Sequence, residues 1–405
     1  MASKATNIHS RCKHSHPPRK NTSRTWQQRK LGELGFTYSG LSGKNKSDFG
    51  HGSAYFVTYL NVFSNPIADC YGIEAVEIDD KQHKVITGDI FFTASSETPE
   101  DVGMTSLWLG AQDNLYLNSF CFGYRMTANH NSIFMAYSLR SPQFRSKIQL
   151  LAQGISRFNI SKKKVMELIS TFPSLSEQIR IAEFFRVLDD LIAAAKKKAD
   201  LLKLKKRYYL QAIFNQRLRF KGFTEPWQQR KLGELFKERS ERSNQGELIS
   251  VTITNGVVPA SSLERKDNSS EDKSNYKQVK TGDIAYNTMR MWQGASGVSP
   301  YSGILSPAYT VLIPSSEVSS SFFAQMFKLV RMLHLFQRYS QGLTSDTWNL
   351  KYPLLSEIRV TIPSLAEQER ISEFLVLNDE LTALVKKKAE DLQKIKSYYL
   401  QQLFV

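Results

Sequence analysis

An internal repeat constrains the fold of this sequence more than any other feature. The nine residues WQQRKLGEL stand at positions 26–34 and again, without change, at positions 227–235. Four shorter segments also occur twice: TGDI starts at 87 and 281, PSLxEQ at 173 and 363, KKKA at 196 and 386, and YYLQ at 208 and 398. Self-similarity of this kind marks a structural unit that is repeated along the chain. The sequence therefore predicts one module in tandem.

The two modules are alike at their ends and differ in between. We expect a first body at residues 26–172 with a shared segment at 173–218, and a second body at residues 219–362 with a shared segment at 363–405. A chain of 405 residues is long enough for each body to bury its own core. Shared ends around different bodies predict one scaffold that carries two different specificities.

Both shared segments have the pattern of a long helix. Each begins with Ser-x-x-Glu, at Ser174 and Glu177 and at Ser364 and Glu367, which fits a capping box at a helix N-terminus. No proline interrupts either segment after its cap. Apolar residues then recur at spacings near three and four, at Ile181, Phe184, Leu188, Leu191, Ala195, Leu202 and Tyr209 in the first segment and at Ile371, Phe374, Leu381, Val385, Leu392, Ile395 and Tyr399 in the second.

Apolar stripes of this kind are typical of a coiled-coil seam. The simplest arrangement buries the two stripes against each other, and in the alternative each helix packs on its own body. Lys198 and Lys388 interrupt the seam at equivalent positions, as do Lys205 and Asn378, so we expect uneven pairing. The triple-lysine runs favour a solvated face over a DNA contact.

The bodies have the pattern of mixed α/β domains with many short strands. Residues 85–92 and 279–286 each suggest strand, turn and strand, with Gly-Asp in the turn. We therefore interpret Asp89 and Asp283 as turn residues rather than catalytic carboxylates.

Composition and missing motifs exclude several classes of protein. No stretch approaches the roughly 18 consecutive apolar residues of a membrane span. Cys12, Cys70 and Cys121 are too far apart for the C-x-x-C pattern of zinc sites and redox pairs, which indicates reduced thiols in a cytoplasmic protein. The sequence lacks a Walker A loop, an H-E-x-x-H motif, a nucleophile elbow and the Asn-Pro-Pro-Tyr/Phe signature of adenine methyltransferases. It therefore predicts a chain without a catalytic site.

The net charge of +16 is unevenly distributed. Residues 1–25 contain six Lys and Arg and no acidic residue, and we expect this basic tail to be disordered. It lacks the apolar region of a signal peptide. A metal site at His9, Cys12, His14 and His16 is a weaker alternative, because no second cluster follows to complete the coordination. The basic balance permits nucleic-acid binding without proving it.

Taken together, the repeated motifs resemble the specificity subunits of type I restriction-modification systems. The resemblance runs from Trp26 to the end of the chain. It rests on Trp-x-x-x-Lys-Leu-Gly-Glu, Gly-Asp-Ile, Gln-Gly and Pro-Ser-Leu-x-Glu-Gln in this order in both halves, and on MRMWQGA at 289–295 and SPAY at 306–309. One departure is that residues 19–25 lack the aromatics found before the second tryptophan, in RFKGF at 219–223.

This resemblance implies an α+β fold with two tandem mixed α/β target recognition domains. Two long antiparallel coiled-coil helices would join them with pseudo-two-fold symmetry and set their spacing. Each domain would read one half of a bipartite, asymmetric target in double-stranded DNA. Two methyltransferase subunits and two motor-nuclease subunits would be the partners, and these would hold S-adenosylmethionine, ATP and magnesium, so no cofactor is expected on this chain.

Residues that contact DNA are expected in polar loops, because bases are read by Arg, Lys, Asn, Gln, Ser and Thr side chains in the major groove. Lys162, Lys163 and Lys164 are expected to contact phosphates rather than bases. The base-contact candidates are Ser156, Arg157 and Asn159 after the first Gln-Gly, Thr344, Ser345, Thr347 and Asn349 after the second, and Arg290 and Gln293. For each, an ordinary loop or packing role is the alternative.

Two other functions compete with DNA specificity. The first is a self-sufficient DNA methyltransferase or nuclease, which would act on DNA without partners. The second is a coiled-coil scaffold that binds only proteins, which would not retard DNA in any assembly.

Overall fold

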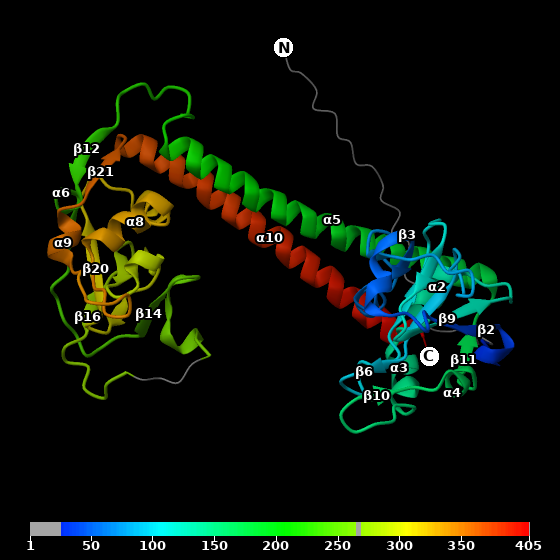
Figure 1. Cartoon of the computed structure of the whole chain (residues 1–405). Coiled ribbons are helices and arrows are strands. Elements are labelled where there is room, and N and C mark those ends of the chain that lie inside the picture. Colours follow the sequence, from blue (N-terminus) through cyan, green and yellow to red (C-terminus); the bar gives the residue numbers. More distant parts are fainter. Residues whose placement is uncertain (1–25, 265–268, 405) are drawn as a thin grey trace, which may run out of the picture. The chain divides into compact units, whose positions relative to one another are not determined.

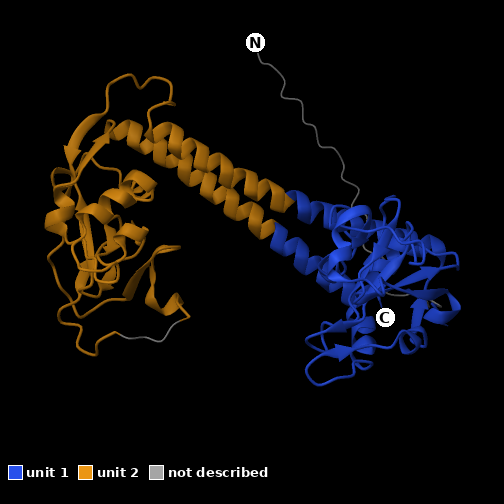
Figure 2. Ribbon diagram, in the orientation of Figure 1, with its two compact units in different colours: residues 1–194, 389–405 blue, residues 195–388 orange. Residues whose placement is uncertain are grey.

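The computed structural model describes residues 26–264 and 269–404, so the expectations for the tail at 1–25 lie outside the described residues. The chain divides into two compact units (Figure 2). Unit 1 comprises residues 1–194 and 389–405, and unit 2 comprises residues 195–388. Each unit thus contains one body and a part of each shared segment.

The shared segments form the two long helices α5 (Leu175–Phe214) and α10 (Leu365–Leu403). In unit 1 the first part of α5 lies beside the last part of α10, and the rings of Phe184 and Tyr399 are 5.0 Å apart (Figure 1). In unit 2 the equivalent positions of the repeat meet, but each now lies on the other helix. The rings of Tyr209 on α5 and Phe374 on α10 are also 5.0 Å apart. The helix segments run antiparallel within each unit, which confirms the coiled-coil pairing.

The seam of each helix follows a regular spacing of three and four residues. Its buried and half-buried members are Phe185, Leu188, Ile192, Ala195, Ala199, Leu202, Lys206 and Tyr209 in α5, and Leu375, Asn378, Thr382, Val385, Ala389, Leu392, Lys396 and Tyr399 in α10. Such a heptad pattern is the one that coiled coils bury.

The sequence placed five seam positions one residue too early. One of them, Phe374, is half-buried beside the seam residue Leu375, and the other four are exposed. Phe184, Leu191, Leu381 and Ile395 are 37%, 45%, 41% and 43% exposed. The expected interruption at the lysine runs is also wrong, because Ala199 and Ala389 occupy the seam there while the lysines are exposed. Among the polar interruptions, Asn378 lies in the seam as expected, whereas Lys205 is exposed and the next residue, Lys206, takes its place.

The first body contains two sheets. The strand order is β2-β9-β5-β7 in the four-stranded sheet and β4-β3-β8 in the three-stranded sheet, where β3 and β8 are parallel. The strands are β2 (Gly35–Ser39), β3 (Phe49–Val57), β4 (Ile73–Val76), β5 (Ile90–Thr93), β7 (Thr105–Leu107), β8 (Leu115–Leu117) and β9 (Cys121–Met126).

The second body repeats this topology. Its sheets have the orders β13-β20-β17-β18 and β15-β14-β19-β16, with β14 and β19 parallel, so β16 is an addition at one edge. The strands are β13 (Phe236–Glu238), β14 (Leu248–Thr252), β15 (Gly256–Pro259), β16 (Lys277–Val279), β17 (Ile284–Asn287), β18 (Ser296–Val298), β19 (Gly303–Leu305) and β20 (Tyr309–Pro314).

Each body closes on itself just before its long helix begins. The repeated nonapeptide supplies β1 (Gln27–Lys30), which pairs with β11 (Ile169–Phe172), and β12 (Gln228–Lys231), which pairs with β21 (Arg359–Ile362). Short elements complete the bodies: β6 (Ser95–Ser96), β10 (Phe158–Asn159), α1 (Tyr59–Ser64), α2 (Ser132–Ser138), α3 (Pro142–Gln149), α4 (Lys162–Met166), α6 (Leu232–Leu235), α7 (Ser320–Met326), α8 (Val330–Tyr339), α9 (Tyr352–Ser356) and the 3-10 turns η1 (Leu31–Glu33), η2 (Lys46–Asp48), η3 (Ala260–Ser262) and η4 (Met291–Gln293).

The repeated Pro-Ser-Leu-x-Glu-Gln motif attaches each long helix to its body. Gln178 Nε2 donates to Pro173 O, and its Oε1 accepts from the backbone N–H of Asn131, the N-cap of α2, with both distances 3.0 Å. Gln368 makes the equivalent bonds to Pro363 and to Ser319, the N-cap of α7. Both glutamines are buried, so a satisfied polar link orients the helix on the core.

The capping boxes are only half confirmed. Ser174 Oγ accepts from the backbone N–H of Glu177 at 3.4 Å, as a capping serine does. The buried carboxylate of Glu367 does not reach back to its cap as expected, because it accepts from two guanidinium nitrogens of Arg219 at 3.0 and 2.7 Å.

The Gly-Asp turns are confirmed, but the hairpins expected around them are wrong. Gly88 and Gly282 have φ of +95° and +92°, a conformation that favours glycine. Residues 85–86 are not in a strand, and β16 and β17 belong to different sheets. The aspartate explains the difference, because its side chain accepts from the backbone N–H three residues earlier, Ile86 or Lys280, and turns the chain from one sheet to the other.

Among the described residues, no helix combines the length and the apolar character that are needed to cross a bilayer.

Candidate nucleic-acid interface

Two loops at equivalent places in the repeat contain seven of the candidate residues. In the first loop, residues 153–159, the backbones of Gln153 and Asn159 exchange two hydrogen bonds of 3.0 and 2.9 Å. In the second, residues 341–349, Gln341 and Asn349 do the same at 3.1 and 2.8 Å. We call these the first and second recognition loops.

Glycine is required at the start of each recognition loop. Gly154 and Gly342 have φ of +143° and +151°. A Cβ on Gly154 would collide with the carbonyl oxygen of Arg157, and one on Gly342 would lie 2.6 Å from the carbonyl oxygen of Thr347. The Gln-Gly signal in the sequence is therefore explained by a tight loop that only glycine can start.

The end of each recognition loop is hydrogen-bonded to the residue that directly follows the equivalent strand of its body, β5 or β17. The backbone N–H of Ile160 donates to Ala94 O at 3.0 Å, and that of Leu350 donates to Thr288 O at 2.9 Å. Ala94 and Thr288 each stand six residues after the repeated Gly-Asp glycine. The two loops thus occupy one structural position in two different bodies.

In the first recognition loop, Ser156, Arg157 and Asn159 are exposed. The Arg157 guanidinium carbon lies 5.1 Å from the centroid of the Phe120 ring, which is itself half exposed. Asn159 Nδ2 donates to Arg157 O at 3.5 Å. Phe120 was not a sequence candidate, and no motif in the sequence marked it. It supports the arginine by a cation–π contact.

In the second recognition loop, Thr344 and Ser345 are exposed, whereas Thr347 and Asn349 shape the loop. The Thr347 hydroxyl donates to the backbone oxygen of Thr344 at 2.9 Å and accepts from the backbone N–H of Thr344 at 3.1 Å. Asn349 is half-buried, and its Oδ1 has no hydrogen-bond partner among the described residues. Thr344 and Ser345 are therefore exposed polar residues of this loop, together with Asp346 and Thr347.

The second body brings Arg290 and Gln293 next to its recognition loop. Trp292, between them, makes an edge contact with Trp348 of the loop, with ring centroids 5.2 Å apart. The Trp292 Nε1–H donates to Met289 O at 3.1 Å, and Arg290 Nη1 donates to Gln293 Oε1 at 3.4 Å. Two separate sequence candidates are thus joined into one site by a tryptophan pair.

The three lysines of the first body do not act alike. Lys162 and Lys163 line a pocket of about 510 Å³ beside the first recognition loop, and Lys162 Nζ donates to Ser39 Oγ at 2.7 Å. Lys164 is exposed and does not line this pocket. The other residues that line the pocket have no charged side chain: Ser39, Gly40, Leu41, Ser42, Ala94, Ser119, Cys121, Phe122, Ile160 and Ser161.

The aspartates of the Gly-Asp turns are held in buried ion pairs. Asp89 accepts from Arg125 Nε and Nη2, both at 2.8 Å, and Asp283 accepts from Arg239 at 2.7 and 2.9 Å. The hydrogen bonds to Asp89 and Asp283 raise the pKa of Arg125 and Arg239, respectively. A carboxylate paired in this way stabilises the turn.

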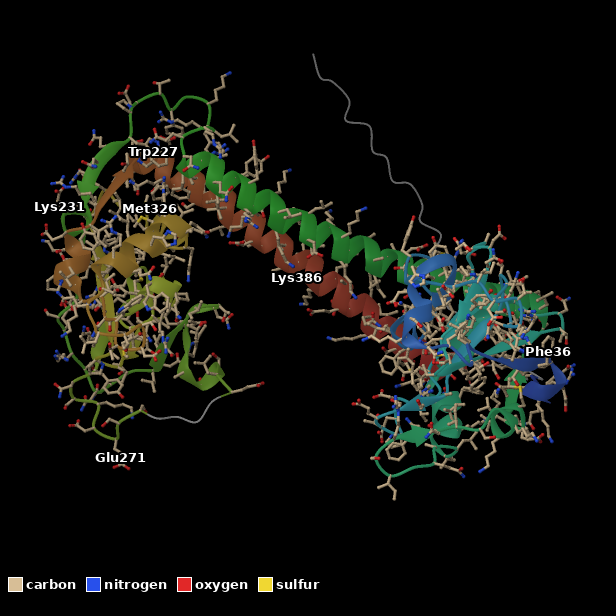
Figure 3. The ribbon with its side chains drawn as sticks, in the orientation of Figure 1. Phe36, Trp227, Lys231, Glu271, Met326 and Lys386 are labelled. Carbon is tan, nitrogen blue, oxygen red and sulfur yellow. The ribbon has the colours of Figure 1, made fainter. Side chains whose placement is uncertain are left out.

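The repeated nonapeptide also has a structural role. Lys30 forms an ion pair with Glu167 at 2.6 Å. Lys231, which is labelled in Figure 3, forms the equivalent pair with Glu357 at the same distance. The triple-lysine runs are exposed on the long helices, and Lys386 is seen on α10 in Figure 3. The part of the chain that the structure describes contains no group of three or more His, Cys, Asp or Glu side chains arranged to hold a metal.

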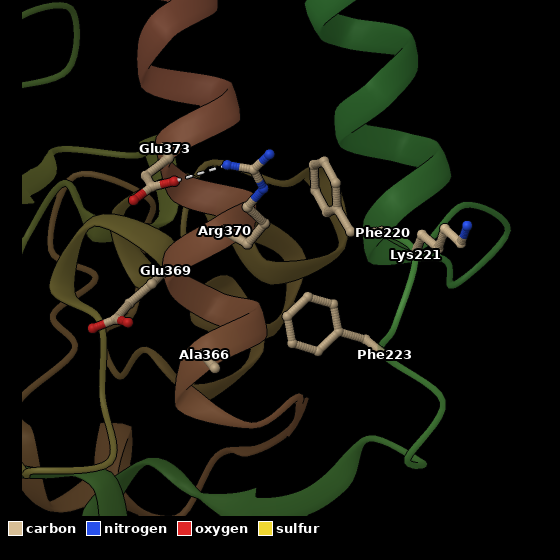
Figure 4. A pocket seen from close by; sticks show the side chains of 7 residues that line it. All are labelled: Phe220, Lys221, Phe223, Ala366, Glu369, Arg370 and Glu373. Atoms are coloured by element: carbon tan, nitrogen blue, oxygen red, sulfur yellow. Dashed lines mark hydrogen bonds and ion pairs between the residues drawn. The ribbon is translucent and has the colours of Figure 1, made fainter. Parts of the chain in front are cut away.

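A further pocket of about 480 Å³ lies in unit 2, where the segment after α5 passes the first turns of α10. Phe220 and Phe223 form one wall and Glu369, Arg370 and Glu373 the other (Figure 4). Its lining balances two acidic side chains, Glu369 and Glu373, with two basic ones, Lys221 and Arg370, so it has no excess of positive charge for the anionic DNA backbone.

Three comparisons with known proteins bear on this arrangement. Residues 224–394 match the model of the type I restriction modification DNA specificity domain. The chain is 22% identical to a putative type I restriction enzyme MjaX specificity subunit of Methanocaldococcus jannaschii, over 93% of this chain and 92% of that protein.

Solved structures share the fold. A type I restriction-modification S subunit from M. genitalium aligns with a TM-score of 0.58 at 18% identity, over 96% of this chain and 98% of that one. An HsdS subunit from Thermoanaerobacter tengcongensis aligns with a TM-score of 0.51 at 15% identity, over 94% and 96%. A third structure, described as showing complex assembly and conformational transition of the type I R-M system, has a TM-score of 0.54 at 16% identity, over 96% and 99%.

Proposed function

The chain belongs to the specificity subunits of type I restriction-modification systems, which recognise DNA and are not themselves catalytic, and we propose that each body reads one half of a bipartite, non-palindromic target. One observation carries this proposal. The two recognition loops are closed by the same Gln–Asn backbone pair but present different side chains between those ends. One scaffold with two sets of readers is what an asymmetric target requires.

The outward polar groups suit base edges in the major groove. Arg157 and Arg290 can each donate two parallel hydrogen bonds to guanine, and Gln293 can donate to and accept from adenine. Thr344 and Ser345 are short and adaptable donors and acceptors. Ser156 and Asn159 complete the set in the first body, while Thr347 and Asn349 orient their loop. Lys162, Lys163 and Lys164 would contact phosphates.

The long helices set the distance between the two half-sites. A 40-residue helix such as α5 rises about 60 Å. This length is enough to hold two readers about one DNA turn apart and to leave helix surface for partner subunits.

Partner subunits would dock on the exposed apolar residues of the helices. In unit 1, Val187 and Leu191 of α5 are 46% and 45% exposed, and the equivalent Leu377 and Leu381 of α10 in unit 2 are 63% and 41% exposed. Exposed apolar groups off the seam are typical of protein interfaces. Their repetition, once in each unit, supports two copies of a methyltransferase subunit for one copy of this chain.

Two motor-nuclease subunits would complete the restriction enzyme. S-adenosylmethionine, ATP and magnesium would be bound by the partners, and the assembly would act in the cytoplasm. The pocket formed by Phe220 and Phe223 with Glu369, Arg370 and Glu373 is a second candidate for a protein contact, because it pairs aromatic rings with charged groups.

Co-expression with its methyltransferase partner tests the proposal. The expected assembly contains one copy of this chain and two of the partner by light scattering, retards DNA, and methylates a bipartite motif that methylome sequencing identifies. A purified chain that methylates or cuts DNA alone would contradict it in favour of a self-sufficient enzyme. An assembly that does not retard any DNA would indicate a protein scaffold.

A further inference from the structure

Each recognition loop has an aliphatic side chain at its tip that contacts almost nothing in its own unit. Ile155 follows Gln153-Gly154 and is 98% exposed, and Leu343 follows Gln341-Gly342 and is 101% exposed. A single exposed leucine on a protein surface needs no explanation. Two such residues at equivalent positions of two otherwise different loops do need one.

The loops hold these side chains away from the bodies. The backbone bonds between Gln153 and Asn159 and between Gln341 and Asn349 close each loop at its base. The positive φ of the glycine before each tip fixes the direction in which the chain leaves. The tips are therefore presented by short closed loops.

The residues beside the tips differ, whereas the tips share their chemistry. Ser156 and Arg157 follow Ile155, while Thr344 and Ser345 follow Leu343. Residues that read different half-sites have to differ between the bodies. An aliphatic residue that is present in both bodies cannot distinguish the different bases of the two half-sites. It is instead expected to act in a step that is common to both half-sites.

In a methylated target, that shared step is the opening of the base stack. A base has to leave the stack before an enzyme can modify it. Proteins that distort duplexes commonly insert an apolar wedge, often Leu or Ile, between adjacent base pairs. An exposed aliphatic side chain beside polar groups that can hydrogen-bond to DNA has the chemistry of such a wedge.

We propose that Ile155 and Leu343 are wedge residues, each of which enters the base stack at one half-site and supports the opening of the duplex for the methyltransferase partner. The proposal rests on the proposed function, because it takes duplex DNA with two methylated half-sites as the ligand. The polar neighbours of each tip then read the bases beside the opened step.

The test uses the full chain assembled with its methyltransferase subunits and its target duplex. The adenine to be methylated in one half-site is replaced by 2-aminopurine, whose fluorescence rises when it leaves the stack. The variants are Ile155→Ala and Leu343→Ala, with Ile155→Leu and Leu343→Ile as conservative replacements. Leu60→Ala and Val330→Ala serve as controls, because these residues are 69% and 68% exposed and lie outside the recognition loops.

We expect each alanine variant to lose most of the fluorescence rise at its own half-site only. Methylation of that half-site is measured on the unsubstituted duplex, because 2-aminopurine lacks the 6-amino group of adenine. It should fall about tenfold or more, since unstacking is needed for the reaction. The methylated motif should stay the same. The conservative and control variants should behave as the parent.

Two results would overturn the wedge. Unchanged fluorescence and methylation in both alanine variants would show that the tips do not open the duplex, and a changed base in the motif would make them readers. Failure of the proposed function looks different, because then the unmodified assembly itself would neither bind nor methylate a bipartite target.

Discussion

Asp189 on α5 and Lys396 on α10 form an ion pair in unit 1, with Oδ1 and Nζ 2.5 Å apart. The same pair of repeat positions meets in unit 2, where Lys206 Nζ lies 2.6 Å from Asp379 Oδ2. Both lysines occupy seam positions that an apolar residue would fill in a regular coiled coil. Each pair therefore fixes the register of the two helices at one place in its unit.

The two pairs should differ in their contribution to stability. Lys396 is buried, and Asp189 also accepts from the Tyr137 hydroxyl at 2.7 Å, whereas the side chain of Asp379 is 50% exposed. We expect Lys396→Ala to lower the free energy of unfolding by about 2 kcal/mol, because it leaves a partly buried carboxylate short of a partner. Lys206→Ala should cost less than about 1 kcal/mol. Urea unfolding of the two variants measures this difference, and equal losses would be inconsistent with it.

Sequence periodicity predicted the existence of the seam but not its exact register. At Phe184-Phe185 and Leu191-Ile192 two adjacent apolar residues fit the pattern equally well, and only packing against the other helix selects the second of each pair. Lys396 in the seam could not be predicted from the pattern, because its partner Asp189 lies 207 residues away.

The lysines of the first body should act on affinity rather than on sequence preference. Replacing Lys162 and Lys163 together by Ala should reduce the salt dependence of DNA binding by about two units in the log–log slope, because each phosphate contact releases about one counterion. The methylated motif should not change. Lys196→Ala with Lys197→Ala removes the same charge from an exposed helix face and is the matched control.

The measurement is a titration of target DNA at several salt concentrations with the assembled methyltransferase. If the control pair lowers the slope as much as replacement of Lys162 and Lys163 does, the pocket of Lys162 and Lys163 has no specific role in phosphate binding.

The candidate site was predictable in part. Gln-Gly marked both recognition loops, because a loop this tight needs glycine in a positive-φ conformation. The sequence could not indicate that Trp292 and Trp348, 56 residues apart, bring Arg290 and Gln293 to the second loop. Nor could it assign Phe120 as the support of Arg157, since that contact depends on the fold of the first body.

The long helices should act as a ruler. Four residues inserted in α5 just after Lys206 add about 6 Å of rise, which corresponds to one or two base pairs at about 3.4 Å each. The gap of the methylated motif should widen by that amount while both half-sites keep their sequences. Some activity should be lost, because four residues also turn the helix by about 40° beyond a full turn.

Methylome sequencing of cells that carry the insertion gives the gap directly. A four-residue insertion after Lys221, in the segment between α5 and β12, is the control and should leave the gap unchanged. If the α5 insertion keeps activity and the parental gap, the helices do not measure the distance between half-sites.

If the two bodies read DNA independently, exchange of one body should change only one half of the target. Residues 227–362, which contain the whole second recognition loop, would be replaced by the equivalent residues of a specificity subunit with a different target, and the methylome of cells with the chimeric assembly would be compared with that of the parent. One half of the motif should change to the donor's sequence while the other half stays the same. A motif that changes in both halves, or in neither, would contradict independent reading by the two bodies.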